Sequence, residues 1–504
     1  MKERKQLKAG VILSYGNVLL HNIISIIYTP VMLRILGKSE YGLYQLVFSV
    51  VSYLGLLNFG FGSTYVRFHA KHQVENDEDG IARLNGMFMT IFLVLGLISL
   101  LAGSVLVVCV EDIFHQSLTS SEIQTARILM VLMVFNLAIS FPISVFDSFI
   151  TAKEQYFFQR MITVLQTILN PFLTLPLLLL GYKSVSLVVI TTLLTAAKLI
   201  MNMWFCFRKL HMKFDFRHFN LRYLKEIWVF SFYIFLNMIV DQINWSVDKF
   251  LIGKMIGTVA VAVYSIGGQM NTYFMNFSTS ISSVFIPRVN RLVSAKRGDR
   301  ELTELFTKVG RIQFLVLSLV LSGFILFGQY FISAWAGEGY ESAYLISLVL
   351  IIPVTVPLIQ NIGVEIQRAK NLHKFRSVVY LLIAFGNICI SVPLIRLWGE
   401  FGAAVGTACS LIAGNIIVMN IYYQKRVGLD MFYFWKQIAN ILPGMILPAA
   451  VGMLYRILVG PLSLITFLVG VALYIIVFSI SMWLFGMNQE EKVLVRSIIP
   501  GIKE

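Results

Sequence analysis

The sequence is a succession of apolar runs, each close to the length of one membrane-crossing helix. A helix needs about 20 residues to cross the roughly 30 Å of hydrocarbon in a bilayer, and roughly fourteen such runs fit between Leu7 and Phe485. Because a helix satisfies its own backbone hydrogen bonds in lipid, the sequence predicts an all-α, polytopic membrane protein. The expected spans cover residues 10–33, 42–64, 84–108, 126–149, 160–181, 184–206, 226–247, 258–284, 309–333, 343–364, 377–397, 402–424, 436–457 and 461–485.

The composition and the motifs exclude several classes of function. Hydrophobic residues make up 57% of the chain and charged residues only 13%, and the net charge is +15. The basic residues lie in short loops and form no basic recognition helix, so nucleic acid is not an expected partner. No P-loop and no cysteine or histidine spacing typical of a metal site is present, so we expect a transporter without a metal or other cofactor. Any energy for transport would come from a gradient, such as one of H⁺ or Na⁺.

The distribution of basic residues predicts the orientation. If the N-terminus lies in the cytoplasm, 33 of the 41 Lys and Arg residues fall in inner segments or near inner helix ends. Cytoplasmic loops of membrane proteins carry an excess of these residues. We therefore expect a multi-pass protein of the bacterial cytoplasmic membrane with both termini in the cytoplasm.

The chain resembles itself at an offset near 217 residues. Three residues of the fifth span recur in the eleventh, namely Phe158, Asn170 and Pro176 as Phe375, Asn387 and Pro393. A repeat of six spans has the same orientation in both copies, as in two-lobed transporters that bind substrate between their lobes. The predicted organisation is an N-lobe of six spans, a cytoplasmic linker, a C-lobe of six spans, and two extra spans with a cytoplasmic tail, over residues 1–206, 207–225, 226–424 and 425–504.

Polar residues recur at helical spacing within several spans. Steps of three and four residues place each set on one face of a helix, and such a face avoids hydrocarbon. Because the stripes occur in the first, second, seventh and eighth spans, they predict a hydrated cavity that binds substrate, although polar helix packing explains any single stripe equally well. The candidate cavity residues are Asn17, His21, Gln45, Asn237, Asn244, Gln269 and Tyr273. The fourth span has a further stripe, formed by Asn136, Ser140, Ser144 and Asp147.

Two carboxylates of the seventh span are candidates for ion coupling. Asp241 and Asp248 are two helical turns apart on one face, and an intramembrane carboxylate can carry a proton or coordinate Na⁺. The alternative for Asp248 is a pair with Lys249 or Lys254 at the membrane interface.

Three arginines at span ends are candidates for phosphate contacts. Arg34, Arg67 and Arg311 carry the planar guanidinium group that matches phosphate oxygens. The alternative is that each reaches out to the phosphates of membrane lipids.

Several short motifs follow one another in a specific order along the chain. They are Leu33-Arg34-Ile35-Leu36-Gly37-Lys38-Ser39-Glu40-Tyr41-Gly42-Leu43-Tyr44, Asn58-Phe59-Gly60, Arg67, Asp248 with Ile252-Gly253, Val263-Tyr264, Ile286-Pro287-Arg288 and Gly298-Asp299. Their order resembles that of bacterial polysaccharide-unit flippases, and the resemblance covers essentially the full length. These flippases belong to the multidrug/oligosaccharidyl-lipid/polysaccharide exporter superfamily.

The resemblance implies two six-helix lobes in a V and transport by alternating access. The implied substrate is an oligosaccharide repeat unit linked to undecaprenyl diphosphate, flipped to the outer leaflet for O-antigen, capsule or exopolysaccharide synthesis. The implied partners are this lipid-linked oligosaccharide, membrane lipids, and possible companion glycosyltransferases and a polysaccharide polymerase. The alternatives are a cation-coupled multidrug exporter of the same superfamily, a flippase for lipid II or another cell-wall precursor, and a membrane-embedded glycosyltransferase or polymerase. The last would need a large outer loop, and the outer loops at 109–125 and 334–342 are short.

Overall fold

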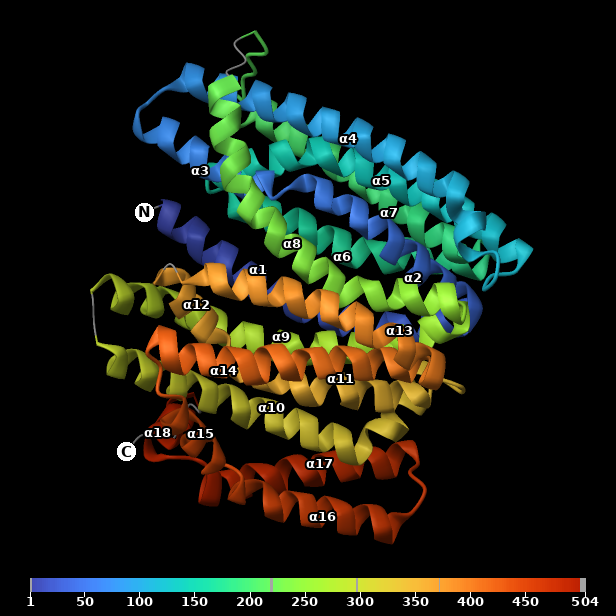
Figure 1. Ribbon diagram of the computed structural model, residues 1–504, viewed down its shortest axis with the longest axis vertical. Coiled ribbons are helices and arrows are strands. Elements are labelled where there is room, and N and C mark those ends of the chain that lie inside the picture. Colours follow the sequence, from blue (N-terminus) through green and yellow to red (C-terminus); the bar gives the residue numbers. More distant parts are fainter. Residues whose placement is uncertain (1, 218–220, 296–297, 371, 499–504) are drawn as a thin grey trace. The chain divides into compact units, whose positions relative to one another are not determined.

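The computed structural model describes residues 2–217, 221–295, 298–370 and 372–498, and the regular elements of these ranges are helices (Figure 1). Ten helical segments in the described ranges are long and apolar enough to cross a membrane by length and composition. This finding confirms the predicted all-α, multi-pass architecture, whereas the count of fourteen spans stays a prediction. Side chains are described in these ranges except at residues 2–15, 17–19, 221–223, 233, 237, 240–241, 244–245, 373–374 and 497–498.

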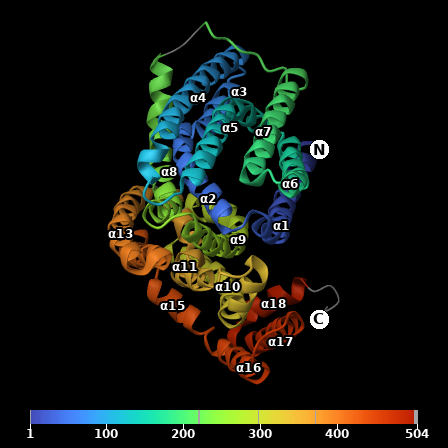
Figure 2. The same ribbon diagram turned by 90° about the vertical axis from the view of Figure 1, so that its right-hand side faces the viewer.

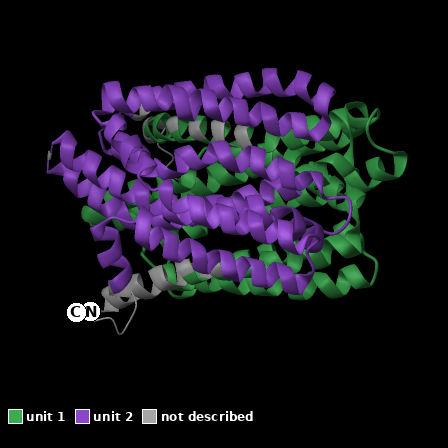
Figure 3. Cartoon of the chain, turned by 90° about the horizontal axis from the view of Figure 1, so that it is seen from below, with its two compact units in different colours: residues 1–265 green, residues 266–504 purple. Residues whose placement is uncertain are grey.

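The chain forms two compact units, residues 1–265 and 266–504, which Figure 3 colours separately. In unit 1, α5 packs against α4 and α7, and α6 packs against α1 and α7 (Figures 1 and 2). The predicted lobe boundaries stay a prediction. The helices of unit 1 are α1 (Lys2–Leu36), α2 (Lys38–Ser52), the 3₁₀ helix η1 (Tyr53–Asn58), α3 (Phe61–Val74), α4 (Glu78–Phe114), α5 (Ser120–Ala152), α6 (Tyr156–Leu179), α7 (Lys183–Arg208), α8 (Leu221–Met255) and the start of α9 (Thr258–Ser294).

Unit 2 contains the rest of α9 and the remaining helices. Here α10 packs against α11 and α17, and α16 packs against α17. Three short π-helical stretches, η2 to η4, continue or end longer helices. The elements are α10 (Asp299–Ala336), α11 (Ser342–Ile359), α12 (Asn361–Ala369), α13 (His373–Leu411), η2 (Ile412–Val418), α14 (Met419–Tyr422), η3 (Tyr423–Val427), α15 (Met431–Ala439), α16 (Pro443–Val459), α17 (Leu464–Ser481), η4 (Met482–Gly486) and α18 (Gln489–Ile498).

Side-chain caps fix where several helices begin. Thr119 and Glu122 form a reciprocal capping box at the start of α5, in which each side chain accepts a hydrogen bond from the other residue's backbone N–H. Asp77 accepts a hydrogen bond from the Gly80 N–H at 2.7 Å at the start of α4. This bond holds the pKa of the Asp77 carboxyl below its usual range. Such caps satisfy backbone donors that have no partner within the first helical turn.

The predicted span 42–64 is interrupted in the structure. Helix α2 ends at Ser52, and α3 begins only at Phe61. Between them, η1 leads into Phe59 and Gly60, which both adopt the left-handed conformation, with φ of 50° and 68°. The backbone is therefore not regular α-helix throughout this span, although Lys38–Val74 as a whole remains long and apolar enough to cross a membrane.

The break between the predicted spans 377–397 and 402–424 does occur, although α13 continues from the first span into the second and ends there at Leu411. Trp398 and Gly399 have non-helical backbone angles inside α13, and Gly399 has a φ of 62°. The conformation at Gly399 is one that glycine adopts without the steric cost that other residues meet.

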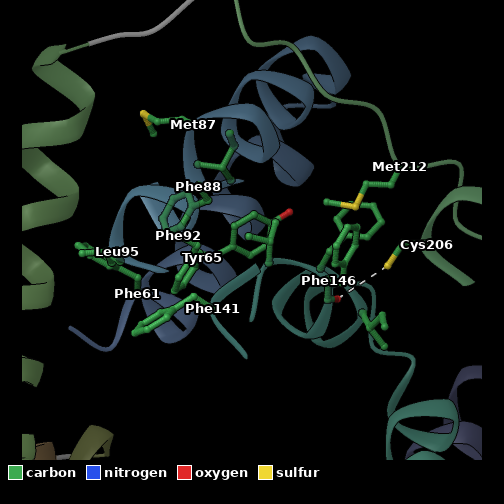
Figure 4. Close-up of a cluster of buried hydrophobic side chains, with 14 of the residues drawn as sticks. Phe61, Tyr65, Met87, Phe88, Phe92, Leu95, Phe141, Phe146, Cys206 and Met212 are labelled. Carbon is green, nitrogen blue, oxygen red and sulfur yellow. Dashed lines mark hydrogen bonds between the residues drawn. The ribbon is translucent and has the colours of Figure 1, made fainter. Parts of the chain in front are cut away.

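The core of unit 1 is an aromatic cluster (Figure 4). Phe61 and Phe88 meet edge to face, with ring centroids 6.3 Å apart. Beside them, Tyr65 donates a hydrogen bond of 2.5 Å to Asn85, and Asn85 donates one of 2.8 Å to the backbone oxygen of Lys213. The start of the predicted linker is thus held against α4, because the buried amide of Asn85 needs partners for its polar atoms.

The internal repeat reappears as one hydrogen bond in each unit. Asn170 donates to Thr191 Oγ1 at 3.3 Å in unit 1, and Asn387 donates to Thr407 Oγ1 at 3.2 Å in unit 2. The two asparagines are the pair that the sequence offset of 217 residues aligns. In both units, therefore, the asparagine joins the same two consecutive spans of the predicted repeat.

Candidate functional site

A row of polar contacts joins α8 to the interrupted second span of unit 1. Lys249 donates to Gln45 Oε1 at 3.1 Å, and Gln242 donates to Ser52 Oγ at 2.6 Å. Further along, the hydroxyls of Thr64 and Ser231 are 2.7 Å apart. Polar side chains in a membrane protein face other helices or water, since contact with lipid would leave them without hydrogen bonds.

The interruption between α2 and α3 leaves a partly exposed segment next to these contacts. None of the residues of η1 is buried, although the segment lies within a helical stretch that is long and apolar enough to cross a membrane. Non-helical backbone at membrane depth is tolerated only where protein buries it or where it lines a water-filled cavity. Each residue of η1 keeps partial exposure, while the segment packs against α2, α4, α5 and α8.

Lys249 is a cation near the end of α8 and is held by a neutral side chain. It lies six residues before the end of α8 at Met255, or about 9 Å along the helix axis. None of the ion pairs formed within the described part of the chain includes Lys249. Gln45 in turn donates its amide to Tyr41 Oη at 3.0 Å, which orients its carbonyl oxygen toward the ammonium. The pair leaves a positive charge without a carboxylate partner among the described residues, and such a group attracts anions.

Asp248 has a different environment from its sequence neighbour. Its side chain is 2% exposed, and Tyr264 Oη donates a hydrogen bond of 2.5 Å to its Oδ2. The ion pair with Lys249 considered from the sequence is not among the described contacts; consecutive helical residues point in different directions, and Lys249 turns to α2. The role of Asp248 in ion coupling stays a prediction.

The other predicted cavity residues divide into three groups. The side chains of Asn17, Asn237, Asp241 and Asn244 lie outside the described residues. His21 is described, and its side chain is exposed on α1. In unit 2, Gln269 donates a hydrogen bond of 2.7 Å to Tyr273 Oη, so these two residues share one face of α9 as their spacing predicted.

The three arginines predicted to contact phosphate have unlike surroundings. Arg34 is exposed near the end of α1, and the guanidinium of Arg67 lies 4.3 Å from the ring centroid of Phe230. Arg311 instead forms a buried ion pair with Glu491, in which Nε and Nη2 donate at 2.7 and 2.9 Å. Both of these side chains are 5% exposed or less, so the pair holds α18, and the phosphate contact of Arg311 stays a prediction.

One carboxylate ties three helix starts together at one end of unit 1. Glu122 Oε1 accepts hydrogen bonds from Ser39 at 2.6 Å and from Thr258 at 2.8 Å, while Oε2 accepts from the Thr119 N–H at 2.9 Å. At the same place, Gly42 lies so close to the Thr258 carbonyl that an added Cβ would be 1.8 Å from the oxygen. We call Ser39, Thr119, Glu122 and Thr258 the Glu122 cluster. It holds the starts of α2, α5 and α9 in close contact.

The sequence reasoning missed Lys249 as a site residue and considered it only as a partner for Asp248. No strong signal for it was present in the sequence, because Lys249 lies two residues after the expected span 226–247. The described residues contain no group of three or more His, Cys, Asp or Glu side chains that could hold a metal ion.

The sequence comparisons agree on one kind of protein. A family model described as polysaccharide biosynthesis protein matches residues 7–293. The uncharacterized membrane protein EpsK of Bacillus subtilis (strain 168) is 24% identical over 430 residues, which cover 83% of each chain. A putative O-antigen transporter of Shigella flexneri is 20% identical over 400 residues, which cover 77% of this chain and 91% of that one.

Solved structures share the fold. The lipid II flippase MurJ in an inward closed conformation matches with a TM-score of 0.74 and 13% identity, over 94% of this chain and 98% of MurJ. A multidrug resistance MATE family transporter in an inward-facing conformation matches with a TM-score of 0.64 and 12% identity, over 81% of this chain and 94% of that one. At such identities the likeness concerns the fold alone, and the choice of substrate has to be argued from the residues of this chain.

Proposed function

The chain belongs to the polysaccharide biosynthesis protein family, and on this premise we propose that it flips a sugar unit linked to an anionic lipid diphosphate across the membrane. In this proposal the carrier lipid is undecaprenyl diphosphate and the glycan serves O-antigen, capsule or exopolysaccharide synthesis. The curated relatives support this direction, since one of them is named as a putative O-antigen transporter.

The observation that carries the proposal is the Lys249–Gln45 contact. A diphosphate entering an apolar environment needs a cation and hydrogen-bond donors, because an unpaired charge there is costly. Lys249 supplies the cation, and its neutral partner Gln45 leaves the charge available to the substrate. A multidrug exporter for organic cations would gain nothing from a positive charge here, since like charges repel. The contact therefore favours an anionic substrate over that alternative.

In this proposal the protein works by alternating access from the cytoplasmic side. The N-terminus lies in the cytoplasm, as the distribution of basic residues suggests, so the start of α5 and the Glu122 cluster lie at the outer surface. The hydrogen bonds of the cluster then keep the outer end of unit 1 closed while the substrate enters from inside. Reporter fusions test this orientation: a fusion after Lys209 should read cytoplasmic and one at Glu338 external.

The function is tested by reconstitution into liposomes that contain a fluorescent glycan linked to undecaprenyl diphosphate. Accessibility of the label to a membrane-impermeant quencher reports the leaflet in which the lipid lies. We expect the unsubstituted protein to equilibrate the label between leaflets. The Lys249→Met variant should slow this at least tenfold, whereas Lys249→Arg should retain most of it. Lys254→Met is the matched control, because it removes an exposed lysine from the same helix.

Three results would count against the proposal. Flipping by Lys249→Met at the unsubstituted rate would remove Lys249 from the site. No flipping of any diphosphate-linked glycan, together with export of a cationic dye, would favour the multidrug exporter. Equal flipping of lipid II would favour a cell-wall precursor as substrate. Asp241→Asn tests the predicted ion coupling separately, since it should reduce gradient-driven transport without reducing the amount of protein in the membrane.

A further inference from the structure

Unit 1 contains another lysine, on a helix long and apolar enough to cross a membrane, and this one forms an ion pair. Lys198 of α7 donates to Asp147 Oδ2 of α5 at 2.6 Å. Asn202, one turn after Lys198, donates to the other carboxylate oxygen, Oδ1, at 2.8 Å. Both helices are among those long and apolar enough to cross a membrane. Lys198 is the sixteenth residue of the 26-residue α7, so its backbone lies near the middle of that helix, whereas Asp147 lies five residues before the end of α5 at Ala152. Charges in such positions are expensive and are usually retained for function.

The two members of the pair are held unequally. Asn202 is 1% exposed, so the amide that holds Asp147 is fixed in the protein interior. The side chains of Lys198 and Asp147 are each 23% exposed. Lysine has a long flexible stem and aspartate a short one, so the ammonium is the mobile partner. The buried Arg311–Glu491 pair is the opposite case, since its side chains are only 4% and 5% exposed.

A polar stripe leads along α5 to the pair. Asn136 donates to the hydroxyls of Thr192 and Thr195 at 3.2 and 3.1 Å. Ser140 and Ser144 follow at helical spacing, and these α5 residues, like Asp147, are half-buried. The stripe that the sequence showed in this span is thus a continuous, partly accessible polar surface on α5 that ends at the ion pair.

We infer that Asp147 is an exchangeable counter-ion for Lys198, and that Lys198 leaves it to bind the diphosphate of the substrate. The inference rests on the proposed function. In the empty carrier, Asp147 offsets the cost of a positive charge at membrane depth. When the substrate arrives, phosphate oxygens replace carboxylate oxygens around the ammonium, while Asn202 keeps Asp147 in place. Return of Lys198 to Asp147 then helps to release the anion.

This exchange predicts that substitutions of the two partners change anion binding in opposite directions. Removing the lysine removes a contact with the substrate, so Lys198→Met should weaken anion binding. Removing the carboxylate removes the competitor of the substrate, so Asp147→Asn should strengthen anion binding and slow its release. If the ion pair served only to hold α5 against α7, both substitutions would change anion binding in the same direction.

The experiment measures the binding of farnesyl diphosphate to the purified full-length protein in lipid nanodiscs by titration calorimetry. We expect Lys198→Met to weaken binding at least tenfold, Lys198→Arg to retain it, and Asp147→Asn to tighten it severalfold. Lys183→Met is the matched control, since it removes the other lysine of α7 at the opposite helix end. If Asp147→Asn does not fold, Asp147→Ser tests the same point, because it also removes the competing carboxylate and should also tighten binding.

The outcomes separate the inference from the proposed function. Weaker binding by Asp147→Asn, or restored binding in the Asp147→Asn/Lys198→Met double variant, would show a purely structural pair and overturn the inference. Unchanged binding by Lys198→Met would overturn it as well, while leaving the proposed function in place. Failure of the unsubstituted protein to bind farnesyl diphosphate would instead overturn the proposed function, and the inference with it.

Discussion

The docking of the C-terminal helix α18 depends on one buried ion pair. Arg311 Nε and Nη2 donate to the two carboxylate oxygens of Glu491, and Arg311 also donates to the backbone oxygens of Gly486, at 3.0 Å, and Gln437. Glu491 in addition caps α18, since its carboxylate accepts from the Asn488 N–H at 2.9 Å. Replacing Glu491 by Gln keeps the shape of the side chain but leaves the Arg311 charge buried without its counter-ion.

The magnitude follows from comparison with a neighbouring exposed pair. Removing one partner of a buried ion pair costs roughly 3–5 kcal/mol. Lys308 and Glu490 also join α10 to α18, at 2.6 Å, but Glu490 is 70% exposed. Exposed pairs contribute about 0.2–1 kcal/mol. The Glu491→Gln variant should therefore lose about 2–4 kcal/mol more than Glu490→Gln. At 1.4 kcal/mol for each factor of ten, this corresponds to a roughly 30- to 1,000-fold larger opening equilibrium for α18.

Amide hydrogen exchange of α18 measures this equilibrium, because exchange reports the free energy of local opening. We expect strong loss of protection over α18 in Glu491→Gln and a small loss in Glu490→Gln, with α4 and α5 unchanged in both. Equal exchange in the two variants would show that the burial of the Arg311–Glu491 pair does not determine docking, and the reasoning from exposure would fail.

Three further predictions concern the ends of the helices. Gly42→Ala should separate α2 from α9 and lower the free energy of unfolding by roughly 1–3 kcal/mol, as at other overpacked sites, because the added Cβ meets the Thr258 backbone. Thermal melting in detergent should show a lower transition temperature, and an unchanged transition temperature would refute the close approach. Glu122→Gln should speed amide exchange at the starts of α2 and α5, since charge-assisted hydrogen bonds are about twice as strong as neutral ones; no change would mean that the Glu122 cluster does not hold these helices. The hydrogen bond from Lys308 holds the pKa of Glu490 below its usual range. The contribution of the Lys308–Glu490 pair to α18 docking is therefore complete above the usual glutamate pKa and is lost as the pH falls through the lowered pKa of Glu490. Amide exchange of α18 measured against pH should show this loss, and the Lys308→Gln variant should not show it.

Some of the fold follows from local sequence alone. Each apolar run has to form a helix in lipid, because only a helix satisfies its backbone groups within one segment. The break near Gly399 follows likewise from the short polar turn between two such runs. The break at Phe59 and Gly60 lies inside one apolar run, and neither the length nor the hydropathy of the run revealed it.

The candidate site was predictable only in part. Helical spacing placed Gln45 on a polar face of its span and Asp147 on another, because spacing along one helix determines which residues share a face. Their partners, Lys249 and Lys198, come from helices 204 and 51 residues further along the chain. Which helices meet depends on packing and on the rotation of each helix about its axis, and no single span encodes either of these.

The sequence by itself therefore determined that the chain crosses the membrane many times and which helix faces are polar, since both properties follow from the chemistry of consecutive residues. Only the tertiary structure decided which polar groups are neutralised. It placed Glu491 against Arg311, Asp147 against Lys198 and a neutral amide against Lys249. The reason is physical: whether a charge in an apolar environment is compensated depends on atoms within a few ångströms of it, and these atoms belong to other helices.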